Sequence, residues 1–269
     1  MSEYIIKNDQ GIKITVRDVH KRLLPLIKEI DRVCTINNIE YILDGGSALG
    51  AIRHSGFIPW DDDFDIVMTR SQYDLFIKAL DKDLDSKYHY QCYKTHKEYN
   101  ILLPEMKIRI KDTYLKEKNV LLNHNCKDGD GLFIDVFVLD YSNSNFYSDF
   151  FNRLMNLILM PLLVILQVCN IKAIWLKNIM QNHAINYGLR NSNSKLVGHT
   201  LTWTFRNPLN PLIFEKSKLF PAQKVIFEDT SLPVAKDYDY FLTKMFGVNY
   251  MSKPPIEAQK PKHIVDIRL

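Results

Sequence analysis

The sequence predicts an α+β protein with a mixed sheet, flanking helices and one apolar helical insertion. Three observations support this class. Apolar stretches with the two-residue period of strands are concentrated before residue 140, they alternate with stretches of helical period, and residues 146–189 are apolar with few strand or turn signals. Hydrophobic residues make up 46% and charged residues 25% of the 269 residues, which excludes disordered, collagen-like and coiled-coil proteins.

The first elements can be placed from residue spacing. Apolar residues on one face predict a helix over 16–36, which Pro25 should kink or split. Residues 41–43 predict a short strand, and Ser47 can cap a helix through Arg53. Residues 64–68 predict a second strand, and a capping box at Ser71 predicts a helix to about residue 80.

The later elements are shorter. We expect strands at 88–93, 101–110, 113–115 and 132–139, with a turn at 129–131 before the last of them. In the tail, residues 223–227 predict a strand. Asp237 can cap a helix through Met245, and Gly247 stands in the position that ends it.

These elements suggest three units. Residues 1–145 form the expected core, 146–190 an apolar helical subdomain, and 191–269 a C-terminal lobe that packs on the core. Residues 154–169 are the most hydrophobic run. They suit either a buried helix or a helix lying in a membrane surface, with contact through 154–175. A full membrane span is disfavoured because Asn156, Pro161 and Gln167 interrupt the run.

Charge and cysteine content narrow the partners. The net charge of +4 is too small to indicate nucleic acid, and none is expected. Residues 150–190 carry four basic residues and no acidic one, which suits a membrane surface. The four cysteines are widely spaced, His124 and Cys126 lack further ligands for zinc, and reduced thiols are expected. The N-terminus shows no secretory signal, so we expect a cytoplasmic protein, either free or peripheral on the inner face of the cytoplasmic membrane.

The most informative stretch is 43–69. Gly45, Gly46 and Ser47 follow a strand and open a helix, an arrangement that lets backbone N–H groups approach a phosphate. Residues 61–65 then place four carboxylates in five positions, and alternation puts Asp63 and Asp65 on one face of the next strand. A solvated acidic turn accounts for Asp61 and Asp62 but poorly for Asp65, which enters an apolar run.

Asp135 interrupts another apolar strand, where an unpaired charge would be costly. If the two strands are neighbours, Asp63, Asp65 and Asp135 converge. Such hard oxygen ligands suit Mg²⁺ or Mn²⁺.

A strand, Gly-Gly-Ser, a helix, an Asp-apolar-Asp strand and a later apolar-Asp-apolar strand together resemble the nucleotidyltransferase fold of the DNA polymerase β type. More narrowly, residues 46–66, with Phe57-Ile58-Pro59-Trp60 before the carboxylates, resemble the signature of the LicD family. Residues 107–109, 133–140 and the tail from Phe227 to Pro255 extend the similarity over most of 20–263.

The resemblance implies transfer of a substituted phosphate from a CDP-activated donor, CDP-choline or a CDP-polyol, to a glycan or glycolipid hydroxyl. CMP would leave, and the acceptor would be a precursor of lipopolysaccharide, teichoic acid or capsule. It implies metal ligation by Asp63, Asp65 and Asp135. Asp135 is the first choice of base, with Asp61 and Asp62 as rivals. The residues that would contact donor phosphate or acceptor charge are Gly45, Gly46, Ser47, Arg53, Lys107 and Arg109.

Two other functions remain open. A true nucleotidyltransferase would add NMP to a small molecule, and a membrane-associated scaffold would keep the fold without catalysis.

Overall fold

A mixed sheet forms the centre of the molecule in the computed structural model, which describes residues 4–9, 12–92, 94–96, 99, 105–118, 131–169, 171–199 and 211–269. The main path of the sheet runs β10 (Ile213–Glu215), β9 (Leu196–Gly198), β8 (Phe133–Ser142), β4 (Asp65–Thr69) and β3 (Ile42–Leu43). In addition, β6 (Met106–Ile110) pairs with β8, and β5 (Tyr88–Cys92) pairs with β6. Since β4 and β8 are parallel and the other pairs antiparallel, the predicted α+β class with a mixed sheet is confirmed.

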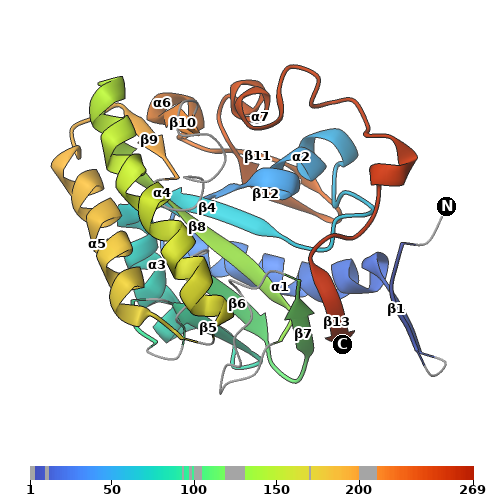
Figure 1. Cartoon of the computed structure of the whole chain (residues 1–269). Helices are drawn as coiled ribbons and strands as arrows, with labels where there is room; N and C mark the ends of the chain where they lie inside the picture. Colours follow the sequence, from blue (N-terminus) through green and yellow to red (C-terminus); the bar gives the residue numbers. More distant parts are fainter. Residues whose placement is uncertain are drawn as a thin grey trace.

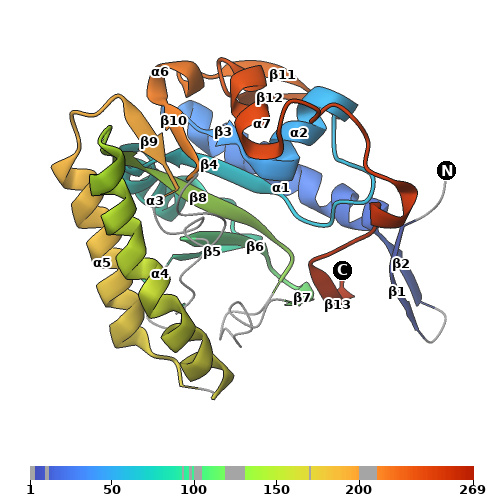
Figure 2. The same cartoon turned by 45° about the horizontal axis from the view of Figure 1, so that its top comes forward.

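Helices cover this sheet in separate groups (Figures 1 and 2). α1 (Val16–Ile36) and α3 (Arg70–Asp83) lie behind it in Figure 1, and α2 (Gly45–His54) and α7 (Tyr238–Phe246) lie together near its upper edge. The short elements α6 (Lys216–Leu219) and η2 (Ile256–Ala258) belong to the tail. Three two-stranded sheets complete the fold: β1 (Ile5–Asp9) with β2 (Ile12–Thr15), β11 (Gln223–Phe227) with β12 (Thr230–Val234), and β13 (Ile264–Arg268) with β7 (Tyr114–Glu117).

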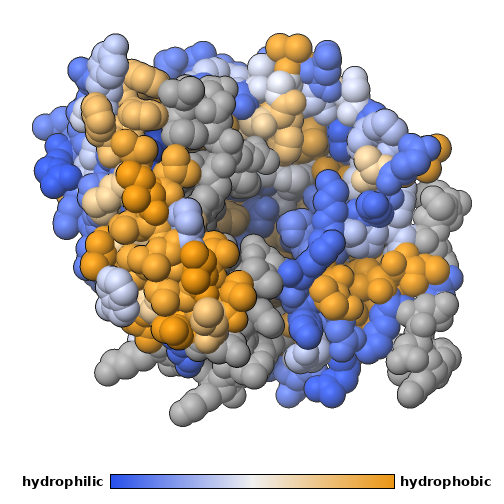
Figure 3. Space-filling model, in the orientation of Figure 1, coloured by the Kyte–Doolittle hydropathy of each residue, from blue (hydrophilic) through white to orange (hydrophobic). Residues whose placement is uncertain are grey.

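The predicted apolar insertion consists of two helices, α4 (Phe146–Val168) and α5 (Ile174–Arg190). α5 packs against β8, and α4 runs along α5 at the left of Figure 1. In Figure 3 hydrophobic residues gather on the outer side of these helices. The insertion is therefore helical as expected, but much of its apolar surface is not used for packing.

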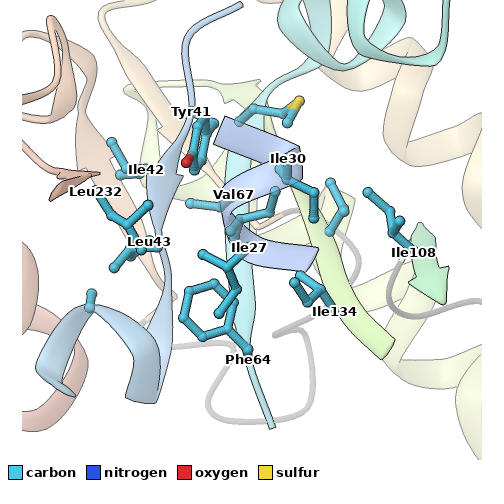
Figure 4. Close-up of a cluster of buried hydrophobic side chains, with 14 of the residues drawn as sticks. Ile27, Ile30, Tyr41, Ile42, Leu43, Phe64, Val67, Ile108, Ile134 and Leu232 are labelled. Atoms are coloured by element: carbon cyan, nitrogen blue, oxygen red, sulfur yellow. The ribbon is translucent and has the colours of Figure 1, made fainter. Parts of the chain in front are cut away.

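The hydrophobic core lies between α1 and the sheet (Figure 4). Ile27 and Ile30 of α1 contact the strands through residues such as Leu43, Val67 and Ile134, all 2% exposed or less. Tail residues, among them Phe227 and Leu232, belong to the same cluster. A second, smaller apolar cluster lies between α4 and α5. The C-terminal segment thus shares the core of the first 145 residues, while the three-unit division stays a prediction.

Three local predictions need correction. α1 is one helix through Pro25, so the predicted split does not occur; the proline lies on the exposed face while Leu23, Leu26 and Ile27 hold both sides against the core. Ser47 does not cap α2, which begins at Gly45 after Asp44. α3 begins after Thr69 without a side-chain cap, so the capping box at Ser71 is also wrong.

Other local predictions agree with the structure within a few residues. β11 has the predicted bounds, and α7 is capped by the Asp237 side chain and ends at Gly247. The start of the predicted 101–110 strand, most of the 129–131 turn and the pair His124 and Cys126 lie outside the described residues. The hairpin β1–β2 and the strands β9, β10, β12 and β13 are additional to the prediction.

Gly50 lets the end of α2 approach the loop that leads to residues 61–65. A Cβ atom on Gly50 would lie 2.6 Å from the carbonyl oxygen of Gly56 and 3.2 Å from the amide nitrogen of Ile58. Helix propensity alone would make Gly50→Ala stabilising by about 1 kcal/mol. We expect the backbone clash to reverse the sign, lowering the free energy of unfolding by about 1 kcal/mol or more in urea titrations. A more stable variant would show that the contact relaxes without cost.

Candidate active site

The pairing of three strands places charged residues in one row. β4 and β8 are parallel with Asp65 opposite Asp135, and β8 and β6 are antiparallel with Asp135 opposite Lys107. The Asp135 amide also donates to the Phe64 carbonyl oxygen at 3.0 Å. The expected neighbourhood of the strands bearing Asp65 and Asp135 is therefore confirmed, and both side chains rise from the same region of the sheet.

Burial along residues 61–65 follows the alternation of an extended chain. Asp61, Asp63 and Asp65 are partly exposed, while Asp62 and Phe64 are buried. Phe64 packs against Phe57 and Phe227 in the core. Because the apolar side chain is fixed on the inner face, the three odd-numbered carboxylates must share the outer face. The alternative interpretation of a solvated acidic turn does not hold for Asp62, which is 2% exposed.

The carboxylates on this face repel one another. Burial raises the pKa of Asp65 well above the usual carboxyl range, and Asp63, Asp135, Asp44 and Asp61 raise it further. Burial and the neighbouring carboxylates Asp63 and Asp62 likewise raise the pKa of Asp61. Burial raises the pKa of Asp135 to about 6, although Lys107 acts in the opposite direction. A group of buried carboxylates in this state favours protons or a bound cation.

The tail contributes His263 to this region. Its Nε2 lies 3.2 Å from Asp63 Oδ2, and potential ligand atoms of Asp61, Asp63 and His263 all lie within 4.8 Å of one another. Two carboxylate oxygens and an imidazole nitrogen at this separation can converge on one divalent ion. The donor set that the structure brings closest together therefore differs from the predicted set Asp63, Asp65 and Asp135, and the two sets share Asp63.

Asp62 holds the tail in place. Its carboxylate oxygens accept backbone hydrogen bonds from Lys262, His263 and Ile264 at 2.9–3.3 Å. These bonds occupy both oxygens of a buried carboxylate and fix the residue next to Asp63 against the segment that carries His263. Asp62 thus has a structural role in this arrangement, rather than the role of a free base.

The Gly-Gly-Ser turn lies directly under the carboxylates. Ser47 Oγ accepts a hydrogen bond from the Asp65 amide at 2.9 Å. A Cβ atom on Gly46 would lie 2.2 Å from Asp61 Oδ2, and one on Gly45, whose φ is +49°, would lie 3.4 Å from Asp65 Oδ2. The glycines therefore allow the N-terminus of α2, with its partial positive charge, to approach the acidic face closely.

The three predicted basic residues have different surroundings. Lys107 is fully buried, 2.7 Å from Asp135 and 3.2 Å from Glu117, with its Nζ 3.2 Å from the centre of the Phe133 ring. Arg109 donates to Gln91 Oε1 and the Gly131 carbonyl oxygen. Arg53 donates to two tail carbonyl oxygens, those of Tyr250 and Ser252. Of the three, Lys107 alone contacts a predicted site carboxylate.

Sequence reasoning missed three polar residues near this site: Asp44, Glu117 and His263. Asp44 precedes the glycines and acts on Asp65, so its position after the apolar pair Ile42 and Leu43 was an available signal. Glu117 lies on β7, 10 residues after its partner Lys107, and His263 lies just before β13, 200 residues after its partner Asp63. Only tertiary pairing brings them to the site.

The donor set fits a divalent cation. Carboxylates dominate, they are partly buried and mutually repelling, and one imidazole lies among them. Mg²⁺ and Mn²⁺ take such oxygen ligands together with waters and substrate phosphates. A site with this charge can also align a diphosphate beside a buried carboxylate that accepts a proton.

Comparison with known proteins places part of this chain in a described family of domains. Residues 38–157 match the family described as LicD/FKTN/FKRP, nucleotidyltransferase domain. That range includes the glycine turn, residues 61–65, Lys107 and Asp135, while His263 lies outside it.

One curated relative matches almost the whole chain, and two others match only a short part of it. The lipopolysaccharide cholinephosphotransferase LicD of Haemophilus influenzae is 27% identical over 94% of this chain and 97% of its own length. Uncharacterised proteins of Rickettsia prowazekii and Rickettsia typhi are 40% and 50% identical, but over only 24% and 16% of this chain and 25% and 14% of theirs. The similarity to the Haemophilus protein therefore extends over the tail as well as the matched domain.

We expect Asp62→Ala to lower the free energy of unfolding by about 2 kcal/mol, because three backbone N–H groups lose a buried acceptor. Hydrogen exchange at Lys262, His263 and Ile264 should increase in the same variant. Asp266→Ala is the matched control, because Asp266 lies on β13 and forms an ion pair with Lys7 near the surface. It should lower the free energy of unfolding by less than about 1 kcal/mol, the value of a surface ion pair. Equal effects of the two substitutions would contradict the role of Asp62.

We expect His263→Ala to weaken binding of Mn²⁺ about tenfold or more, because an imidazole ligand beside Asp61 and Asp63 is lost. Titration followed by electron paramagnetic resonance measures this directly. Glu257→Ala, an exposed change in the same tail, is the control. Unchanged affinity in His263→Ala would remove the histidine from the ion site.

Proposed function

We propose, from the premise that this chain belongs to the LicD family, that it transfers phosphocholine or a similar substituted phosphate from a CDP-activated donor. The acceptor is a hydroxyl of a cell-surface glycan or glycolipid precursor, and CMP is released. Membership of the family makes the protein a LicD-type transferase. The donor, the metal dependence and the acceptor are the proposed parts.

The observation that supports the proposal most strongly is the register of β4 against β8. This register sets Asp65 beside Asp135, and Asp63 lies two residues before Asp65. All three residues lie within the matched range 38–157. Transfer of a phosphoryl group requires negative charge to be balanced at the donor diphosphate. Asp63, Asp65 and Asp135, with Asp61 and His263 at the edge, would hold Mg²⁺ or Mn²⁺ for this purpose. When bound, the ion would neutralise the donor oxygens and the leaving CMP.

The chain's own residues account for the remaining requirements. Lys107 keeps Asp135 ionised and in position, since it lies 2.7 Å from its carboxylate. We assign to Asp135 the proton of the acceptor hydroxyl, because a carboxylate beside the donor site can act as the base of this transfer. The hydroxyl oxygen forms the new bond to the phosphorus that carries choline. The bond from that phosphorus to the oxygen of CMP breaks.

The N-terminus of α2 is the proposed cradle for donor phosphate. Gly45, Gly46 and Ser47 supply backbone N–H groups at a helix start, where partial positive charge favours an anion. Arg53 and Arg109 serve the site indirectly, by holding the tail and the residue Gly131 before β8 through backbone carbonyl oxygens. Phosphocholine is the group we favour because the Haemophilus relative is named a cholinephosphotransferase.

Binding of the donor provides the first test. CDP-choline with Mg²⁺ should raise the melting temperature more than CMP, CDP-ribitol or CDP-glycerol, because a ligand of the folded state stabilises it by mass action.

Asp65→Asn should abolish turnover while the protein stays folded. Asp74→Asn, an exposed acid on α3 paired with Lys94, is the control and should keep full activity. Retained activity in Asp65→Asn would contradict the metal assignment.

Asp135→Asn separates two roles of that residue. Loss of transfer with donor binding intact supports a proton acceptor, whereas loss of donor binding makes Asp135 mainly a metal ligand.

The mass of the product distinguishes the alternative suggested by the family description. A nucleotidyltransferase would leave the nucleotide on the product, whereas the proposed reaction adds phosphocholine alone. Absence of binding by every CDP compound and by Mg²⁺ would favour a scaffold.

A further inference from the structure

The helix α4 has its polar residues turned inward. Along its first half the buried positions are Asp149, Asn152, Arg153 and Asn156, each 6% exposed or less. Arg153 forms an ion pair with Asp149 at 2.6 Å and donates to the His199 carbonyl oxygen. Tyr187 of α5 also donates to Asp149. This face of α4 is therefore joined to the body of the protein by polar contacts.

The outward face of the same helix is apolar. Its exposed positions recur at helical spacing, and α5 and the connecting turn continue them. Large hydrophobic residues exposed by 42–71% on this surface are Phe146, Tyr147, Phe151, Ile158, Leu162, Ile165, Val168, Ile171, Ile174, Trp175 and Ile179. We call this set the α4–α5 face. By length and composition α4 is apolar enough to cross a membrane, yet only 28% of its most apolar 18 residues are buried in the protein.

The α4–α5 face gathers eleven exposed large hydrophobic side chains on two neighbouring helices and the turn between them, whereas a monomeric soluble protein usually exposes such residues singly. Figure 3 shows it as a continuous hydrophobic area beside a hollow, and in the matching view of Figure 1 the strands β4 and β8 lie behind that hollow. The face and the opening toward the strands that carry Asp65 and Asp135 are thus presented on the same side of the molecule.

Charge on these helices is basic. Lys172 is exposed in the turn between them, and Arg190 is exposed at the end of α5. The only acidic residue on α4 or α5 is Asp149, which is buried and paired with Arg153. Trp175 is 59% exposed next to Lys172. An apolar face with a cation and an indole at its border matches the composition of surfaces that lie in the interfacial layer of an anionic bilayer.

The inward contacts exclude a spanning orientation for α4. Its polar face would have to leave Tyr187 and the His199 carbonyl oxygen and enter hydrocarbon, where unsatisfied polar groups are costly. A helix that keeps these contacts can meet lipid with its outer face only.

We propose that the α4–α5 face docks in the plane of a bilayer containing anionic lipid and turns the active site toward an acceptor carried by that membrane. The second part rests on the proposed function, because it assumes a lipid-linked acceptor. The first part depends only on the surface. The basic border favours lipid over a second copy of the chain, since the same face of a second copy offers Lys172 and Arg190 no exposed acidic residue on α4 or α5 to pair with.

Flotation of the purified 269-residue chain tests the docking. We expect it to float with vesicles of phosphatidylcholine and phosphatidylglycerol, and less with phosphatidylcholine alone. Ile165→Glu should lower binding about tenfold or more, because a carboxylate replaces an apolar contact at an anionic surface. If Ile165→Glu does not fold, Ile158→Glu provides the same test seven residues earlier on α4. Val248→Glu, which has the same charge change at a site 81% exposed outside the face, is the matched control.

Several results would overturn the docking proposal. No flotation with either vesicle overturns it, and so does equal loss in Val248→Glu. A dimer in light scattering that Ile165→Glu converts to monomer would assign the face to self-association instead. Equal binding to neutral and anionic vesicles, together with no effect of Lys172→Glu on binding, would contradict the proposed preference for anionic lipid.

Activity assays separate this proposal from the proposed function. Ile165→Glu should retain activity toward a soluble, delipidated acceptor and lose about tenfold or more toward the same acceptor in vesicles. Equal loss on both acceptors would overturn the orientation toward the membrane. Flotation without transfer by the unmodified protein would instead contradict the transferase chemistry and leave the docking supported.

Discussion

The pairing of β4 with β8 is the constraint on which the rest of the structure depends. A parallel pair in the middle of a mixed sheet fixes Asp65 against Asp135, and neither side chain can turn away while Phe64 and Val136 remain in the core. The negative charges of two neighbouring carboxylates oppose folding unless a positive charge, a helix N-terminus or a proton compensates them. Lys107 from β6, the N-terminus of α2 and His263 from the tail all approach this pair or its neighbours. Much of the molecule is thus arranged around the cost of one partly buried row of acidic residues.

The same constraint explains how distant segments meet. The odd-numbered residues of 61–65 face the site and the even-numbered ones face inward, so Asp62 is available to bind the backbone of 262–264. That contact brings β13 beside β7, and β7 carries Glu117 to Lys107. The contacts between these distant segments therefore depend on the alternation of inward and outward side chains along residues 61–65.

The sequence contained enough information for the centre of the fold and less for its periphery. The strands with Asp65 and Asp135, the helix after the glycines and α7 follow from local periodicity and end signals. Ser47 was misread because a serine after two glycines looks like a cap, whereas its hydroxyl bonds to the next strand. Asp62 was misread because burial of a carboxylate depends on N–H groups from residues 200 positions away. The α4–α5 region was recognised as apolar, but spacing alone did not show that its polar residues face inward.

The contact between Asp62 and the tail has a consequence for the order in which the protein matures during synthesis. The glycine turn, the carboxylates and α4 leave the ribosome long before residues 262–264, so the acidic face of the emerging chain still lacks His263. Completion of the tail is therefore a late assembly step. A chain that ends upstream of residue 262 lacks both the backbone partners of Asp62 and the imidazole beside Asp63.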